Sequence, residues 1–187
     1  MRVAVISDTH HNAERAAEVL VHIAPFDLLI HVGDGVNDLE ALTKTNKFNA
    51  VGVTGNEDTG CDHPPEITLE LSGLRCHVTH GHQFDLNAYA TSETWDKNTG
   101  DLAQRGNSLG ARMVIFGHTH RPHLSERNGV VLLNPGDLYP MAPRSHAGLI
   151  LIEPDRFKVS VTRYDKDNRL EVILEGSFPI QVDDIPS

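Results

Sequence analysis

The sequence has only two cysteines and lacks any long apolar run. Cys61 and Cys76 are too few and too far apart for a zinc ribbon or a CxxC redox pair, so we interpret both as free thiols. No stretch approaches the ~18 apolar residues of a membrane span, and the apolar segment at the N-terminus is too short for a signal peptide. We therefore expect a cytoplasmic protein that does not enter membranes.

Basic residues are scarce relative to acidic ones. Lys and Arg number 16 against 26 Asp and Glu, which gives a formal charge of −10 with the 12 histidines neutral. Non-specific binding to nucleic acid or to an anionic membrane requires clusters of Lys and Arg, so this charge excludes both kinds of partner. A small phosphorylated substrate is still compatible with it, because a bound metal reverses the charge locally.

Short apolar runs recur along the chain, and Gly, Asp, Asn or His follows each of them. Runs of this length that are rich in Val and Ile predict strands buried on both faces. They are Val3–Ile6, Leu28–Val32, Val51–Val53, Cys76–Val78, Met113–Phe116 and Val130–Leu133. A length of 187 residues is typical of one domain, and no linker interrupts the chain, so we predict a single domain over residues 1–187.

Two helices are predicted between the first three apolar runs. Asn12 caps a helix that ends near Ile23, and Asn37 or Asp38 caps another that ends at Thr45. Alternating strands and helices of this kind predict parallel βαβ units. We also expect Val21 to pack a helix onto a sheet.

The pattern changes after Asp62. Residues 67–71 and 74–78 alternate between apolar and polar, which predicts an antiparallel hairpin, and residues 86–109 form a polar stretch that we expect to be helical. The C-terminal part predicts further hairpins, with turns at Asn128-Gly129 and Asp167-Asn168. The expected fold is α/β, with two mixed sheets packed face to face and helices outside.

Potential metal ligands directly follow the apolar runs. They are Asp8, His10, Asp34, Asn56, His80, His82, His118 and His120. Ligands of open α/β sheets bind beyond the carboxyl ends of the strands, so these side chains are expected at one edge of the fold. Each alone could be a helix cap, a turn residue or a surface histidine. Their joint occurrence at five strand ends, with glycines beside them, predicts a metal site.

These motifs, in this order, resemble those of the calcineurin-like metallophosphoesterases. The similarity is greatest to the small single-domain prokaryotic phosphodiesterases and extends from Met1 to about Tyr164. The motifs are Asp8-Thr9-His10, Gly33-Asp34, Gly55-Asn56, His80-Gly81-His82, Gly117-His118-Thr119-His120 and Asn134-Pro135-Gly136. The resemblance implies a four-layer α/β/β/α sandwich and a hydrolase with two metal ions.

The resemblance also implies a ligand for each ion. Asp8, His10 and His120 would hold one ion, Asn56, His80 and His118 would hold the other, and Asp34 would bridge the two. Imidazole with carboxylate and amide oxygen suits Mn²⁺, Fe²⁺, Zn²⁺ or Ni²⁺ better than Ca²⁺ or Mg²⁺, and a manganese pair is our first choice.

Such a pair lowers the pKa of a shared water, so that a bridging hydroxide attacks phosphorus in line. We predict that Asp34, Asn56 and His82 take part in the reaction. For His82 and His11, contact with the phosphate and exposure to solvent are both open interpretations. Asn134 and Asp137 are candidates for orienting the imidazoles. The related proteins usually have Ser in place of Asp137, which weakens its case.

The residue after Asn56 departs from the family pattern. Many members have a histidine there that is thought to protonate the leaving group, whereas this chain has Glu57. An ionised Glu is a poor proton donor unless burial raises its pKa. We therefore expect better activity on activated diesters than on esters with poor leaving groups. The alternative is that Glu57 is simply a solvated turn residue.

Two further questions concern aromatic residues and the class of function. Tyr89 and Trp95 could stack on a base or an aryl leaving group, or could pack in the core or at a dimer contact. A small phosphodiester is the expected substrate, with a phosphomonoesterase or protein phosphatase as the alternative enzyme. A scaffold that binds proteins is the alternative class, because the retromer scaffold subunit resembles the same fold without all the ligands. All seven ligand positions are present here, which favours catalysis. The resemblance also implies a homodimer.

Overall fold

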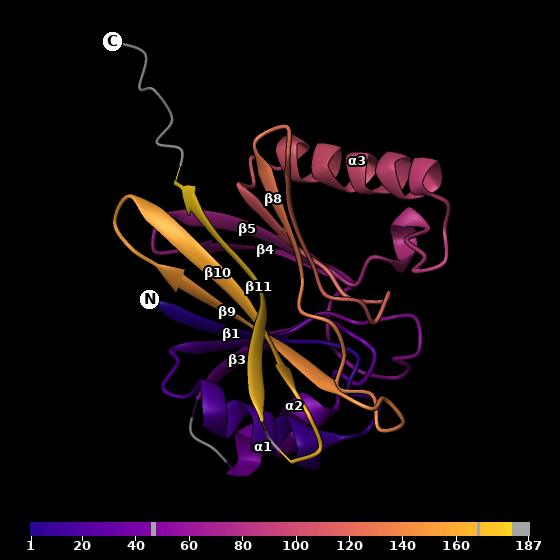
Figure 1. The fold of residues 1–187 in the computed structure, drawn as a ribbon, viewed down its shortest axis with the longest axis vertical. Coiled ribbons are helices and arrows are strands. Elements are labelled where there is room, and N and C mark those ends of the chain that lie inside the picture. Colours follow the sequence, from indigo (N-terminus) through magenta and orange to yellow (C-terminus); the bar gives the residue numbers. More distant parts are fainter. Residues whose placement is uncertain (46–47, 168, 181–187) are drawn as a thin grey trace.

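Two β-sheets form the centre of the computed structural model, which describes residues 1–45, 48–167 and 169–180 (Figure 1). The first sheet contains β1 (Arg2–Ile6), β2 (Leu28–His31), β3 (Asn49–Gly52), β9 (Ser145–Ile152), β10 (Arg156–Tyr164) and β11 (Leu170–Pro179). The second contains β4 (Glu66–Leu71), β5 (Leu74–Thr79), β6 (Met113–Ile115), β7 (His123–Arg127) and β8 (Val130–Asn134). The strand orders are β11-β10-β9-β1-β2-β3 and β4-β5-β6-β8-β7.

The first half of the chain forms the predicted parallel units. β1, β2 and β3 pair in parallel, and α1 (Ala13–Ile23) and α2 (Asp38–Thr45) connect them. Two details of the α1 prediction are wrong. The Asn12 side chain does not cap the helix, because its amide donates to the Leu138 carbonyl 3.0 Å away. Val21 is 74% exposed, since it lies on the face of α1 opposite its buried residues.

The predicted antiparallel hairpins are also present. β4 and β5 pair across Ser72-Gly73, and β7 and β8 pair across Asn128-Gly129. β9, β10 and β11 form a meander, which β9 joins to β1. Of the predicted Asp167-Asn168 turn, Asn168 lies outside the described residues, and the Asp165 carboxylate accepts the Asp167 backbone N–H at 2.8 Å.

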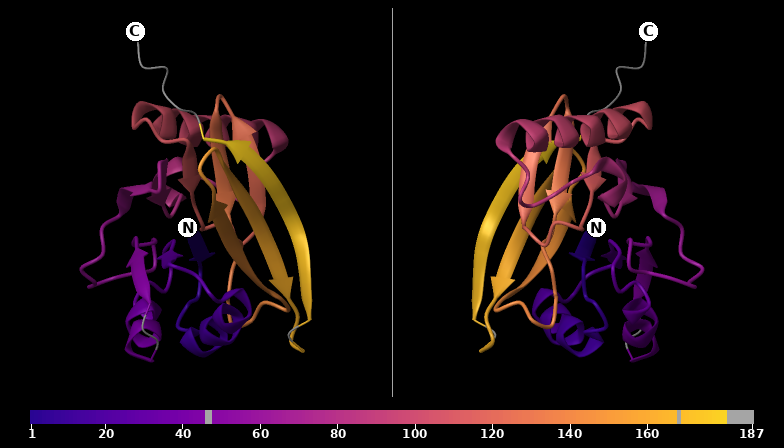
Figure 2. Two further views of the ribbon diagram at one scale, coloured as in Figure 1. Left: turned by 90° about the vertical axis from the view of Figure 1, so that its left-hand side faces the viewer. Right: turned by 90° about the vertical axis from the view of Figure 1, so that its right-hand side faces the viewer.

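Apolar side chains fill three layers between the elements. The central cluster joins both sheets, for example Ile30 of β2 and Ile115 of β6, which are fully buried. A second cluster packs α1 and α2 on the outer face of the first sheet, and a third packs α3 (Ser92–Ser108) on the second sheet. Figure 2 shows α3 at the opposite end of the molecule from α1 and α2. The predicted four-layer α/β/β/α sandwich is therefore confirmed.

The segment before α3 is less helical than predicted. A short 3₁₀ turn, η1 (His82–Phe84), ends at Asp85, whose φ of 51° is left-handed. The Asn87 side chain then accepts the Tyr89 backbone N–H at 2.8 Å. The helix starts only after Thr91, whose hydroxyl accepts the Thr94 N–H at 3.2 Å.

The described residues include no helix long and apolar enough to span a membrane. Both cysteines are free thiols, as predicted. Cys76 is fully buried in the central cluster, and this burial raises the pKa of its thiol.

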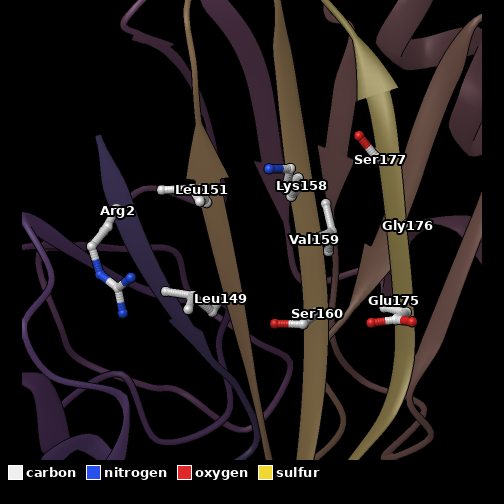
Figure 3. Close-up of a pocket in the computed structure, with 9 residues that line it drawn as sticks. All are labelled: Arg2, Leu149, Leu151, Lys158, Val159, Ser160, Glu175, Gly176 and Ser177. Carbon is white, nitrogen blue, oxygen red and sulfur yellow. The ribbon is translucent and has the colours of Figure 1, made fainter.

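A hollow of about 520 Å³ lies over β9, β10 and β11, away from the strand ends that carry the predicted ligands. Figure 3 shows residues that line it, which include Leu149 and Leu151 of β9, Lys158 and Ser160 of β10 and Glu175 of β11. The predicted metal ligands lie elsewhere, in the loops described next.

Candidate metal centre

The predicted ligands lie in the loops that follow β1, β2, β3, β5 and β6. Five of them have a left-handed backbone, with φ between 45° and 67°. They are Asp8, His10, Asp34, His118 and His120. This conformation is uncommon for residues other than glycine, and each instance costs about 1 kcal/mol or more, so such residues concentrate at functional sites. The strained residues are those whose donor atoms point toward one another.

Asp8, His10 and His120 form the first cluster of donors. One ligand atom from each lies within 4.8 Å of the others. His120 Nε2 is 3.3 Å from Asp8 Oδ1 and 3.3 Å from His10 Nε2. The structure thus brings together all three residues predicted for one ion.

Asp34, His80 and His118 form the second cluster, within the same 4.8 Å limit. His80 Nε2 lies 3.2 Å from Asp34 Oδ2 and 4.0 Å from Asp8 Oδ1, so the two clusters adjoin. Asp34 also groups with His10 of the first cluster and with Glu57. This central position is the one that a bridging carboxylate requires.

Several buried donor atoms of the site lack a hydrogen-bond partner among the described residues. They include His82 Nδ1, and also Asp8 Oδ1 and His80 Nε2, which lie 3.3 Å from His120 Nε2 and 3.2 Å from Asp34 Oδ2, respectively, but outside hydrogen-bond geometry. Asp8 and His80 are fully buried, and an unpaired polar atom in the interior costs about 1 to 3 kcal/mol. Unpaired oxygen and imidazole nitrogen atoms that converge are the donor set of a transition-metal site. The residues present therefore fit divalent metal ions.

The other ring nitrogens of the imidazoles are held by acceptors. His80 Nδ1 is 2.7 Å from the Val32 carbonyl, and His120 Nδ1 is 3.3 Å from Asp137 Oδ2. His10 Nδ1 is 3.1 Å from Glu57 Oε2. A proton on each Nδ1 leaves the Nε2 lone pair directed into the cluster, which is the arrangement that metal-binding histidines need.

The carboxylates of Asp8 and Asp34 are each held through one oxygen. Asp8 Oδ2 accepts from the Ser7 hydroxyl at 2.5 Å and from the His118 N–H at 3.1 Å. Asp34 Oδ1 accepts from the Glu57 N–H at 2.8 Å. The remaining oxygen of each carboxylate faces the cluster, so each is oriented before any ion binds.

The neighbouring glycines allow this close packing. A Cβ atom on Gly117 would lie 2.0 Å from Ser7 Oγ, and one on Gly55 would lie 2.1 Å from Asp34 Oδ1. Only glycine fits at these positions without moving a carboxylate. The expectation that glycines let the donors approach one another is met at both.

Opposite charges strongly perturb the titration of the site. The adjacent carboxylates of Asp137 and Asp8 raise the pKa of His120 to about 10. Burial would raise the pKa of Asp34, but the adjacent imidazole of His80 outweighs burial and lowers this pKa to about 2. Burial lowers the pKa of His118. A metal ion bound at His120 would therefore compete with a proton.

The remaining predicted residues surround the two clusters. Asn56 is exposed, and its chain neighbours Gly55 and Glu57 both contact Asp34. His82 is half-buried, with its ring centroid 5.5 Å from that of His80. His11 is exposed, as the solvent-facing interpretation predicts. Metal binding or catalysis by any of these residues stays a prediction.

Of the two residues proposed to orient imidazoles, Asp137 contacts one and Asn134 does not, while Glu57, for which no such role was predicted, also contacts one. Glu57 is therefore more than a solvated turn residue. The Asn134 amide donates to the Gly117 carbonyl at 2.7 Å and to Thr119 Oγ1 at 3.1 Å. The prediction for Asn134 is wrong because its amide holds Gly117 and Thr119, the residues on either side of His118, instead.

Two residues that sequence reasoning missed build the surrounding loops. The Asp58 carboxylate accepts the N–H groups of Gly35, Val36 and Gly55 within 3.1 Å. His31 Nδ1 accepts the Gly33 N–H at 3.2 Å, and its Nε2 lies 3.0 Å from the Thr9 hydroxyl. A polar residue at a strand end was the available signal for His31, whereas the neighbours of Asp58 give none.

Trp95 packs within the protein, as one of its two interpretations predicts. Its ring centroid lies 5.3 Å from that of His123 in an edge-on arrangement, and it packs against the cluster beneath α3. Tyr89 behaves differently, because 88% of its surface is exposed.

Known proteins of similar sequence are named as phosphoesterases. A probable metallophosphoesterase of Methanothermobacter thermautotrophicus is 32% identical over 96% of this chain and 95% of its own length. A phosphodiesterase of Methanocaldococcus jannaschii is 27% identical over 73% of this chain and 84% of its own.

Solved structures share the fold. A predicted phosphoesterase of Streptococcus pneumoniae superposes with a TM-score of 0.74 at 23% identity, covering 95% of this chain and 97% of that one. A Vps29 of Entamoeba histolytica superposes with a TM-score of 0.72 at 20% identity, covering 95% and 99%. Residues 1–156 match the family model described as the calcineurin-like phosphoesterase superfamily domain. The two clusters of donors at the strand ends and this match lead to one conclusion: the chain belongs to the calcineurin-like phosphoesterase superfamily.

Proposed function

We propose that this metallophosphoesterase uses two divalent metal ions to hydrolyse small phosphodiesters. The observation that carries the proposal is the pair of adjoining donor clusters, Asp8, His10 and His120 beside Asp34, His80 and His118. Ions held by these residues would supply a water activated for in-line attack and positive charge for the phosphoryl oxygens. The name of the M. jannaschii relative supports a diester as the substrate.

Each residue of the two clusters has a place in this proposal. Asp8, His10 and His120 would hold one ion, Asn56, His80 and His118 would hold the other, and Asp34 would bridge the two. Manganese is our first choice, with iron, zinc and nickel as alternatives of the same ligand chemistry. The pairing of His80 with Val32 and of His120 with Asp137 keeps both imidazoles in the tautomer that binds a cation.

The substrate phosphate lies at the exposed side of the clusters. His82 is half-buried beside His80 and His118, with ring centroids 5.5 and 6.1 Å away, and we assign it a hydrogen bond to a phosphate oxygen. The metal charge outweighs the buried carboxylates, so a protein with a net charge of −10 can bind an anion here.

Glu57 explains why we propose activated diesters over monoesters. Its side chain is 63% exposed and its carboxylate is 3.1 Å from His10 Nδ1, so it is placed as an acceptor for His10 rather than as a proton donor to a leaving group. Glu57 therefore does not protonate a leaving group that needs a proton to depart. This disfavours a phosphomonoesterase or protein phosphatase. The unpaired donor atoms of Asp8 and His80 disfavour a scaffold without catalytic function.

The cellular setting is part of the same proposal. A buried free thiol at Cys76 agrees with a reducing compartment, and we place the enzyme in the cytoplasm. We expect it to act on small molecules, without non-specific binding to nucleic acid or membranes. A homodimer stays a prediction from the family resemblance.

The test compares bis-p-nitrophenyl phosphate with p-nitrophenyl phosphate as substrates of metal-stripped protein with and without Mn²⁺. We expect Mn²⁺ to restore cleavage, with the diester preferred, and expect Asp34→Ala and His118→Ala to lose at least 100-fold in kcat/KM. His22→Ala is the matched control, because His22 is an exposed histidine on α1. No turnover with metal bound, or a preference for the monoester, would overturn the proposal.

A further inference from the structure

A cavity of about 400 Å³ adjoins the metal centre. Residues 86–89, between η1 and α3, form one wall, and residues 118–120 form the other. His118 and His120, which belong to different donor clusters, thus face the same cavity. A substrate whose phosphate lies at the clusters would place one of its two substituents here.

Tyr89 lies in this wall and is largely exposed, yet its position is fixed. The Arg121 guanidinium lies 5.1 Å from the centroid of its ring, and Arg121 Nη1 donates to the Ala88 carbonyl at 2.6 Å. The Asn87 side chain accepts the Tyr89 N–H, and Leu86 is 1% exposed and anchors the segment in the core. The ring is therefore held from one side by a cation while most of its surface faces water.

Among the residues that the structure describes, no carboxylate lies within ion-pair distance of Arg121, so no carboxylate neutralises its charge. Arg121 directly follows His120, so the loop that supplies a metal ligand also positions the cation under the ring. An exposed aromatic ring, backed by a cation and beside an anion site, is a surface on which a planar group stacks.

We propose that Tyr89 and Arg121 form a subsite for a planar aromatic substituent of the substrate, such as a nucleobase. The base stacks on the exposed face of Tyr89 while its phosphate lies near His118 and His120. This inference rests on the proposed phosphodiesterase function and adds the class of substrate, a nucleotide diester whose product is a nucleoside monophosphate.

The test measures binding of two product-like ligands to the Mn²⁺-loaded protein by calorimetry. Adenosine 5′-monophosphate carries a base, and ribose 5-phosphate lacks it. We expect the nucleotide to bind roughly 10-fold more tightly, a ratio typical of one stacked base. Tyr89→Leu should reduce the ratio to about one, and Tyr89→Phe, which keeps the ring, should preserve it. Since Tyr89 is 88% exposed, both variants are expected to fold.

Equal binding of the two ligands, no binding of the nucleotide, or a ratio that survives Tyr89→Leu would overturn the subsite. A change of oligomeric state in Tyr89→Leu, with no change in the ratio, would instead assign this surface to a contact between copies of the chain. Hydrolysis of bis-p-nitrophenyl phosphate distinguishes failure of the base subsite from failure of the proposed phosphodiesterase function. If Mn²⁺-dependent turnover persists while the base preference is absent, the subsite fails and the phosphodiesterase stands.

Discussion

Asp137 contacts two imidazoles at once. Its Oδ2 lies 3.3 Å from His120 Nδ1 and its Oδ1 lies 3.1 Å from His146 Nδ1, and the residue is 5% exposed. Burial would raise the pKa of this carboxyl, but the hydrogen bonds from both histidines outweigh burial and lower it. Asp137 is thus an ionised partner that orients His120, a proposed metal ligand, from behind.

We therefore expect Asp137→Asn to weaken Mn²⁺ binding by roughly 10 to 100-fold, because the charge that makes His120 a stronger ligand is removed. Calorimetric titration of the metal-stripped protein measures the change. Asp155→Asn, which alters an exposed carboxylate in the turn after β9, serves as the control and should bind normally. An unchanged affinity in Asp137→Asn would show that the contact with His120 is incidental.

His31 makes the metal-free protein sensitive to acid. Burial lowers its pKa to about 4, against 6.5 in the unfolded chain. At pH values between these two pKa values the unfolded chain binds a proton at this histidine and the folded chain does not. The stability that depends on neutral His31 is therefore fully present above pH 6.5 and decreases as the pH falls toward 4. The total is about 3 kcal/mol. Protonation would also end the acceptance of the Gly33 N–H by Nδ1.

Urea unfolding between pH 7.5 and 4.5 in the presence of a chelator measures this dependence. His31→Asn should have a lower free energy of unfolding at pH 7.5 and a shallower decline toward pH 4.5 than the parent protein. Parallel curves for the two proteins would mean that His31 does not titrate in this window.

Among individual residues, the donor residues are easier to predict from the sequence than the residues that position them. Asp8, His118 and the other ligands could be predicted because each directly follows an apolar run. Asp58 could not, because its partners are backbone N–H groups on loops that only the fold brings near, and His31 was missed although its place at a strand end was a signal. Glu57 was ambiguous for the same reason as Asp58, since its partner His10 is 47 residues away.

Among the elements, the loops after β2 and β3 depend on one another through Asp58. One of its oxygens accepts from Gly35 and Val36, and the other accepts from Gly55. In Asp58→Asn one oxygen becomes an NH₂ group, which cannot accept the N–H that the carboxylate accepted. We expect a loss of about 2 to 4 kcal/mol in the free energy of unfolding, measured in urea with metal removed. A loss below 0.5 kcal/mol would show that solvent replaces these bonds.

Gly117 joins the loop after β6 to the loop after β1. A methyl group there would collide with Ser7 Oγ and displace Asp8, so Gly117→Ala should lower Mn²⁺ affinity at least 10-fold and destabilise the fold. Gly100 within α3 has open space around its Cα, and Gly100→Ala should be neutral or stabilise by about 0.5 to 1 kcal/mol. The two variants carry the same Gly→Ala change at different positions. Equal Mn²⁺ affinities would therefore contradict the role given to the close contact of Gly117 with Ser7 and Asp8.

Strands and hairpins were the most predictable elements, because runs such as Leu28–His31 and turns such as Ser72-Gly73 carry their own local signal. The starts of two helices were harder to predict. Asn12 has the character of a cap, but its amide reaches Leu138, which is 126 residues away. The polar stretch after Asp85 has helical composition, yet the left-handed backbone of Asp85 and the turn at Asn87 delay the helix.

In the whole molecule, the packing of two sheets assembles the site. The first sheet contributes Asp8, His10 and Asp34 through its parallel strands, and the second contributes His80, His118 and His120. Each donor cluster contains residues from both sheets, so neither sheet alone forms a complete ligand set. Sheet packing and metal binding are therefore linked, and bound metal should stabilise the folded protein.

The most direct test of a two-ion centre is to titrate Mn²⁺ into the metal-stripped protein, counting bound ions by equilibrium dialysis and recording the electron paramagnetic resonance spectrum. We predict two ions per chain whose spins are coupled through the shared carboxylate of Asp34, and expect Asp34→Asn to lose that coupling and at least one ion. A single bound ion, or two ions without coupling, would contradict the account.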